Sequence, residues 1–212
     1  MNKIDFVGLH AHSGVGSPFD GFGHPQQHMD FAFENGSRAL ALTDHGNMNG
    51  LAYQVLHAKK MQKQGKDFKS STKSELNRKR HIVLLAMNQT GLNNIFKLVS
   101  ESYHGDNFYR KPRIDFDLLE KHNEGIIALS ACLGGIYAGC YWENREEGSE
   151  AILGCMRDMT RNMLKVFGDR WYGELQWNAI PEQHELNNYV IQMHQEFDIP
   201  LVSTCDSHYP TP

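Results

Sequence analysis

The sequence predicts an α/β fold built on a parallel sheet or a barrel, and three observations point to it. Short apolar runs alternate with longer runs whose apolar residues recur every three to four positions, about six times along the chain. Parallel neighbouring strands need helical crossovers, and the longer runs supply them. His, Asp and Cys residues gather at the ends of the short runs, where such folds place their chemistry.

The elements follow in order from this alternation. Strands are expected where the runs are short and apolar, at 5–12, 39–45, 81–87, 125–131, 171–177 and 199–206. Helices are expected where the apolar period lengthens, at 25–37, 48–65, 90–104, 149–169 and 181–198. Pro25 and Gly36 mark the two ends of the first helix. The basic stretch 63–80 has no apolar strand pattern, which favours a solvated loop, with a nucleic-acid contact as the alternative.

Composition narrows the class of protein. The formal net charge of −4 disfavours a chain held to nucleic acid by its overall field, although a local basic patch stays open. No window resembles a secretory signal or approaches the roughly 18 apolar residues of a membrane span. The four cysteines form no C-x-x-C pair and are expected to be reduced thiols. We therefore expect a cytoplasmic protein with no membrane partner.

Metal-ligating residue types recur at successive strand ends. His10 and His12 alternate in the first predicted strand, so both side chains share one face, and Asp206 and His208 show the same spacing at the last. A lone histidine at a strand end is usually structural, but the repetition predicts one shared site. The candidate ligands are His10, His12, Asp20, His45, His81, Cys132, Asp206 and His208. Two or three metals held there would activate water and clamp phosphate oxygens for hydrolysis.

Other chemistries find little support. The sequence has no G-x-S-x-G elbow, no G-x-x-x-x-G-K-[ST] loop and no G-x-G-x-x-G after a strand. Cys132 as a nucleophile would need a base and an exposed thiolate, so metal ligation is the preferred interpretation.

Several motifs resemble, in order, those of the PHP (polymerase and histidinol phosphatase) domain. They are "HAHS", "ALTDHGNMNG", "RHIVLLAMNQTGLNNIFKLVS", "YRKPRIDFDLLEKHNEGIIALSACLGG", "ELQ" and "CDSHY". "KPRID" and "LSACLGG" are similar to the branch at the N-terminus of bacterial and phage DNA polymerase III alpha subunits. The resemblance implies a distorted (β/α)₇-type barrel forming a single domain over residues 1–212, without polymerase palm or fingers.

The resemblance also implies a function. The same eight ligands would hold two or three divalent transition metals, zinc or manganese first and iron as a further option. The activity would be phosphodiester hydrolysis of the 3′→5′ exonuclease type on a DNA 3′ end, with other replisome subunits as further partners. The alternatives are a degenerate structural module that braces the polymerase and, more distantly, a small-molecule phosphatase.

Two further residues receive catalytic roles in this interpretation. Asp44, beside His45, would orient a ligand imidazole. Arg113, with Arg110 and Lys111, would contact the phosphate backbone, the alternative being a solvated turn.

One departure from the family pattern concerns a bridging glutamate. The family carries a strand with a G-x-E-x-Y motif after the second helix, and this chain shows no such motif there. Glu75 is the only glutamate in the stretch 63–80, which resembles a loop. The sequence therefore predicts one strand missing or altered, with looser metal binding and weak turnover.

Overall fold

The computed structural model describes residues 6–66, 68–75, 80–109 and 111–210, and the chain divides into two compact units. The first unit comprises residues 1–74 and 205–212, and the second comprises residues 75–204. Among the described residues, no helix combines the length and the apolar character that crossing a membrane requires.

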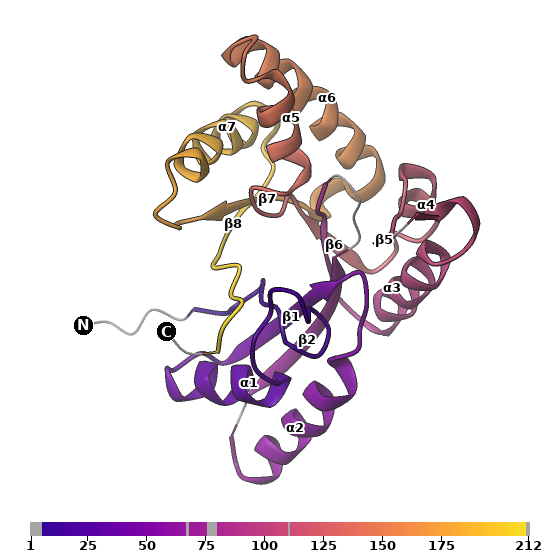
Figure 1. Cartoon of the computed structure of the whole chain (residues 1–212), viewed down its shortest axis with the longest axis vertical. Helices are drawn as coiled ribbons and strands as arrows, with labels where there is room; N and C mark the ends of the chain where they lie inside the picture. Colours follow the sequence, from indigo (N-terminus) through magenta and orange to yellow (C-terminus); the bar gives the residue numbers. More distant parts are fainter. Residues whose placement is uncertain (1–5, 67, 76–79, 110, 211–212) are drawn as a thin grey trace. The chain divides into compact units, whose positions relative to one another are not determined.

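Figure 1 labels the helices and strands of the first unit. These are α1 (Pro25–Glu34), β1 (Ala39–His45), α2 (Leu51–Lys63) and most of β2 (Lys69–Glu75). Pro25 occupies the first turn of α1, where its missing N–H costs nothing, and Gln27 closes a capping box with His24. Met29, Leu42 and Met61 pack with Phe68 into one buried cluster, which fixes both helices against β1.

The segment predicted as the first strand forms only isolated bridges. Gly8 pairs with Leu40 of β1 and Ala11 pairs with Ser207, both in parallel, and residue 5 lies outside the described residues. A side chain at Gly8 would approach the Leu40 side chain to 2.9 Å, so the glycine permits this close approach. Residues 8–12 therefore lie between β1 and the C-terminal segment, although they do not form a continuous strand.

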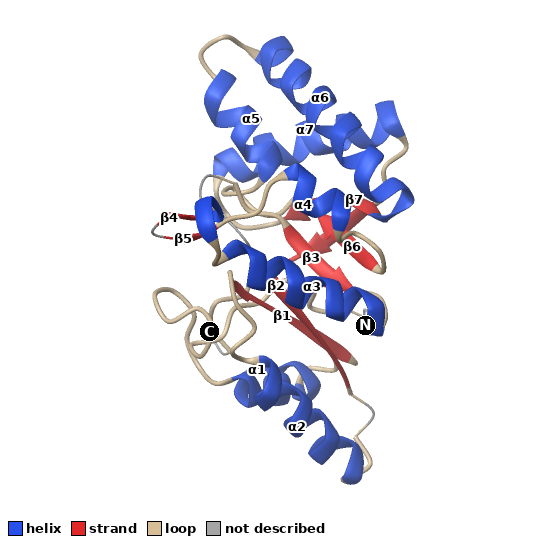
Figure 2. Cartoon of the chain, turned by 90° about the vertical axis from the view of Figure 1, so that its right-hand side faces the viewer, coloured by secondary structure: helices blue, strands red, loops and turns tan. Residues whose placement is uncertain are grey.

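The second unit carries the remaining elements (Figure 2). They are β3 (Val83–Ala86), α3 (Gln89–Ser102), η1 (Gly105–Asn107), β4 (Phe108–Tyr109), β5 (Lys111–Pro112), α4 (Phe116–Lys121), β6 (Ile126–Leu129), α5 (Ile136–Asn144), α6 (Ser149–Phe167), η2 (Gly168–Arg170), β7 (Trp171–Gln176), α7 (Pro181–Phe197) and β8 (Leu201–Thr204). Trp171, Tyr137 and Phe167 are among its largest fully buried side chains.

The strand directions correct the expectation of an all-parallel sheet. β6, β7 and β8 run parallel to one another, whereas β3 is antiparallel to both β2 and β6. Only residues 76–82 connect β2 to β3. A parallel return needs a crossover of a dozen or more residues, so this short connection forces β3 to reverse.

The structure also corrects the prediction of a closed barrel, and it contains a strand where one was predicted to be missing or altered. The strand order is β1-β2-β3-β6-β7-β8, an open sheet. β2 occupies the stretch that the sequence favoured as a loop, and Glu75 pairs with Val83 of β3. The polar sequence of β2 hides it from pattern analysis, because its place depends on backbone pairing with neighbours. The side chain of Glu75 and residues 76–79 lie outside the described structure.

Two of the four cysteines are joined, contrary to the expectation of reduced thiols. Cys140 on α5 and Cys155 on α6 form a disulfide, with their Cα atoms 5.5 Å apart. The packing of α5 against α6 brings the two residues together, which a separation of 15 residues in sequence did not indicate.

Candidate metal centre

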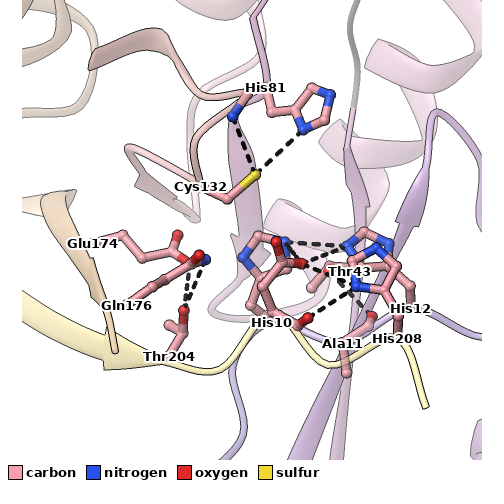
Figure 3. A network of polar contacts seen from close by, with 12 residues as sticks. His10, Ala11, His12, Thr43, His81, Cys132, Glu174, Gln176, Thr204 and His208 are labelled. Atoms are coloured by element: carbon pink, nitrogen blue, oxygen red, sulfur yellow. Dashed lines mark hydrogen bonds and ion pairs between the residues drawn. The ribbon is translucent and has the colours of Figure 1, made fainter. Parts of the chain in front are cut away.

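Two buried histidines, His10 and His12 (Figure 3), form the centre of the site together with Asp206. His10 and His12 are each 1% exposed, and their Nε2 atoms lie 3.2 Å apart. Both Nε2 atoms face Asp206 Oδ1, at 3.0 Å from His10 and 3.1 Å from His12. The bridge between Ala11 and Ser207 places the two segments side by side. These three side chains can offer three donor atoms to one metal ion.

His12 also belongs to a second group of donors. Its ring stacks on those of His45 and His208, with centroids 4.3 and 4.5 Å away. One ring nitrogen from each of the three histidines lies within 4.8 Å of the others. Asp20 Oδ2 lies 2.9 Å from His45 Nε2 and 3.8 Å from His208 Nε2. Because His12 offers one ligand atom, it can serve one metal, and His45, His208 and Asp20 are further donors beside it.

The environment of Asp206 favours its negative charge. Burial alone would raise the pKa of this carboxyl, but the neighbouring imidazoles of His10, His12 and His208 outweigh burial and hold the pKa well below its usual range. Its backbone adopts a left-handed conformation, with φ of 48°. Asp occupies this region more readily than most residues, and the turn aims its side chain back at His10 and His12.

A polar network behind His12 holds the ring in place. Ser17 Oγ lies 3.3 Å from His12 Nδ1 and donates to Asp44 Oδ1 at 3.1 Å, while Ser13 donates to the same carboxylate through its N–H and its hydroxyl. Burial raises the pKa of the Asp44 carboxyl, and the hydrogen bonds from Ser13 and Ser17 oppose that rise. A side chain at Gly16 would come within 2.3 Å of Asp44, so glycine is needed there.

Sequence analysis predicted Asp44 but missed its serine partners. Ser13 and Ser17 lie in the stretch "HSGVGS". The hydroxyls at these two positions, between a histidine pair and an aspartate, are the signal that was available.

His81 and Cys132, the other two predicted ligands, lie in the second unit and contact each other. Cys132 Sγ lies 3.7 Å from His81 Nδ1 and accepts the N–H of Gly134 at 3.5 Å. The N–H of His81 donates in turn to the carbonyl of Gly134. The eight predicted ligands therefore form a six-residue cluster in the first unit and a pair in the second. Their convergence on a single rim stays a prediction.

The predicted phosphate-contacting residues have other contacts. The Arg113 guanidinium donates to the backbone carbonyls of Asp106 and Asn107, at 2.7 and 3.2 Å. Lys111 is exposed on β5, and Arg110 lies outside the described residues. Arg113 thus braces η1 in this structure, and its role toward a phosphate stays a prediction.

A buried polar network in the second unit was not predicted (Figure 3). Glu174 and Gln176 on β7 are 1% and 0% exposed. Glu174 Oε1 accepts hydrogen bonds from Gln176 and from Thr204 on β8, and the Glu174 N–H donates to Ser130 Oγ. The "ELQ" motif contained two of these residues, but no pattern indicated that they were buried together.

The chemistry of the donors in the first unit fits transition metals. Four imidazoles and two carboxylates suit Zn²⁺, Mn²⁺ or Fe²⁺, whereas Mg²⁺ prefers oxygen ligands alone. The network through Ser17 to Asp44 resembles the outer contacts that fix ligand imidazoles in metal sites.

Comparison with known proteins gives a consistent set of relatives. The family model described as the PHP domain matches residues 8–178. The DNA polymerase III subunit alpha of Aquifex aeolicus is 36% identical over 100% of this chain and 19% of its own length. That of Borreliella burgdorferi is 36% identical over 96% and 18%, and that of Thermus aquaticus is 33% identical over 98% and 18%. The chain therefore spans about a fifth of the length of these relatives.

Solved structures share the fold at low sequence identity. A Bifidobacterium adolescentis protein, for which metal-dependent phosphoesterase activity has been proposed, aligns with a TM-score of 0.57 and 13% identity over 95% of this chain and 87% of its own. A Chromobacterium violaceum amidohydrolase, with bound sulfate and no metal, aligns with a TM-score of 0.55 and 17% identity over 96% and 88%. These similarities support the α/β fold.

Proposed function

Because the chain belongs to the PHP domain family, we propose that it is a metal-dependent phosphoesterase domain of the DNA polymerase III alpha type. Its substrate would be a phosphodiester at a DNA 3′ end, cleaved in the 3′→5′ direction. The observation that carries the proposal is the pair of overlapping donor groups around His12. The same proposal includes further expectations. The chain would form a single domain over residues 1–212 and act in the cytoplasm, within a DNA polymerase that contacts other replisome subunits.

Each residue of the cluster has a role in this proposal. His10, His12 and Asp206 would hold one metal, and His45 and His208 would serve a second, with Asp20 beside them. The bound metals would polarise the phosphate and supply a water of lowered pKa. Ser17 and Asp44 would keep the Nδ1 side of His12 hydrogen-bonded, which leaves Nε2 directed at the cluster.

The exposed edge of the cluster is where a substrate has access. Asp20 is exposed, and His45 and His208 are partly exposed, whereas His10 and His12 are buried. A phosphodiester would therefore approach from the side of Asp20, with the buried pair fixing the geometry beneath it.

The structural-module alternative and the expectation of looser metal binding stay predictions. A strand, β2, lies where the glutamate-bearing strand was sought, but its sequence KSSTKSE contains no G-x-E-x-Y motif. The side chain of Glu75 lies outside the described structure. No specific observation favours the small-molecule phosphatase.

The test is hydrolysis of a 5′-labelled single-stranded oligonucleotide by the full chain loaded with Zn²⁺ or Mn²⁺. We expect shortening from the 3′ end, and a loss of at least about 100-fold in Asp206→Asn and His12→Asn. His57→Asn is the matched control, because His57 pairs with Asp30 instead of the cluster. The proposal fails if metal-loaded wild type leaves the oligonucleotide intact, or if all three variants cleave as fast as wild type.

A further inference from the structure

Two exposed aromatic side chains in the first unit lie close in sequence to residues of the metal cluster. Phe22 lies two residues after Asp20, and Tyr209 directly follows His208; each is 65% exposed. Their ring centroids lie 6.0 Å apart with an interplanar angle of 32°. Large aromatic rings left in solvent beside a polar site suggest contact with a ligand.

Backbone hydrogen bonds join the two segments that carry Phe22 and Tyr209. The N–H of Phe22 donates to the carbonyl of His208 at 2.8 Å, so the loop and the C-terminal segment are joined at this point. The same loop is closed by a bond from the Gly14 N–H to the Gly23 carbonyl at 2.8 Å. The backbone at Phe22 is therefore tied to the backbone next to Tyr209 before any ligand arrives.

Among possible ligands, a nucleobase best fits these rings. Bases stack on exposed aromatic side chains without regard to sequence, and the adjoining donor groups suit the phosphate of the same nucleotide. The overall charge of −4 makes a purely electrostatic hold on the strand weak, so stacking would add affinity to the contact between the metals and the phosphate.

We propose that Phe22 and Tyr209 form a stacking surface that positions the terminal bases of a single-stranded DNA 3′ end over the metal cluster. The inference rests on the proposed function and adds to it a preference for base-bearing strands over bare phosphodiesters. Both residues are positioning residues and take no part in bond cleavage.

The experiment measures binding of two labelled hexanucleotides by fluorescence anisotropy, using the full chain loaded with Zn²⁺. One carries thymine at every position, the other has abasic sites at its last two 3′ positions, and both have hydrolysis-resistant phosphorothioate linkages. We expect Phe22→Ala and Tyr209→Ala each to weaken binding of the first by about 5- to 30-fold and to leave binding of the second unchanged. Tyr209→Phe should bind as wild type does. Phe96→Ala is the control, because Phe96 is similarly exposed but lies on α3, far in sequence from the cluster residues.

The outcomes separate this inference from the proposed function. Equal binding of both oligonucleotides by wild type, or equal losses for both in the alanine variants, would overturn the stacking surface even if wild type hydrolyses DNA. A base preference that the alanine variants abolish supports the surface even if wild type hydrolyses nothing. Phe22→Leu and Tyr209→Leu keep apolar bulk without a ring, so they should show the same loss if an alanine variant fails to fold.

Discussion

Ser17 is the residue on which the geometry of the cluster most depends outside the ligands themselves. Its hydroxyl contacts His12 Nδ1, Asp44 Oδ1 and the backbone N–H of His45. We expect Ser17→Ala to weaken Zn²⁺ binding by about 10- to 100-fold, because His12 loses its outer contact. The free energy of unfolding should fall by ~1–3 kcal/mol, because Asp44 and the His45 N–H lose a buried partner. Competition with a chromophoric chelator and urea unfolding measure the two effects.

A matched serine serves as the control for that prediction. Ser203 is exposed and accepts a hydrogen bond from Trp177 at the surface, so Ser203→Ala should change neither quantity appreciably. Identical metal affinity in Ser17→Ala and wild type would show that His12 needs no support from this network.

His28 gives the first unit a pH dependence. Burial lowers the pKa of its imidazole, against the opposing effect of the hydrogen bond with the Phe22 carbonyl. In the unfolded chain the histidine binds a proton near its ordinary pKa of 6.5, while the folded chain resists protonation. Its contribution to stability is therefore complete above pH 6.5 and is lost as the pH falls toward the lower folded pKa. The free energy of unfolding should drop more between pH 7.5 and 5.5 in wild type than in His28→Gln, and equal drops would contradict this.

At the level of residues, the sequence predicted part of the site for a physical reason. A strand-like segment repeats every two residues, so the spacings of His10 with His12 and of Asp206 with His208 indicated shared faces. The structure brings these four together with Asp20 and His45. Ser17 and Glu174 were missed, because hydroxyls and buried carboxylates carry no spacing signal until the fold brings their partners near.

The helices were largely predictable and the strands less so. α6 and α7 match their predicted spans within two residues, since long amphipathic periods and boundary residues act locally. β2 and the reversal of β3 were not predictable, because both depend on pairing between distant backbone segments. The closed barrel inferred from family resemblance is wrong for the same reason: strand order is set by pairing, which the local pattern does not encode.

The α5–α6 pair supplies a prediction at the element scale. The Cys140–Cys155 disulfide closes a loop with a sequence separation of 15 residues. In the chain-entropy account, a loop of this length stabilises the folded state by ~3 kcal/mol. Reduction, or the double change Cys140→Ser and Cys155→Ser, should lower the free energy of unfolding by about that amount in urea. Cys205→Ser should not, because Cys205 is exposed and unbridged; alkylation of four thiols in the unreduced protein would refute the bridge.

Across the whole molecule, the metal cluster joins the two ends of the chain. His12 and Asp206 are separated by 194 positions in sequence, yet their side chains are in contact. The unfolded chain cannot assemble this donor set, so metal should bind the folded state selectively and stabilise it. At a Zn²⁺ concentration 100 times the dissociation constant, the free energy of unfolding rises by ~2.7 kcal/mol, which corresponds to a rise of about 5–10 °C in the unfolding midpoint.

Calorimetry should show this rise in the midpoint with Zn²⁺ or Mn²⁺ and little change with Mg²⁺, since imidazoles dominate the donors. His12→Asn should abolish the rise because His12 belongs to both donor groups, whereas His57→Asn should retain it. A midpoint raised equally by Mg²⁺, or still raised by Zn²⁺ in His12→Asn, would mean that the stabilising ion binds elsewhere.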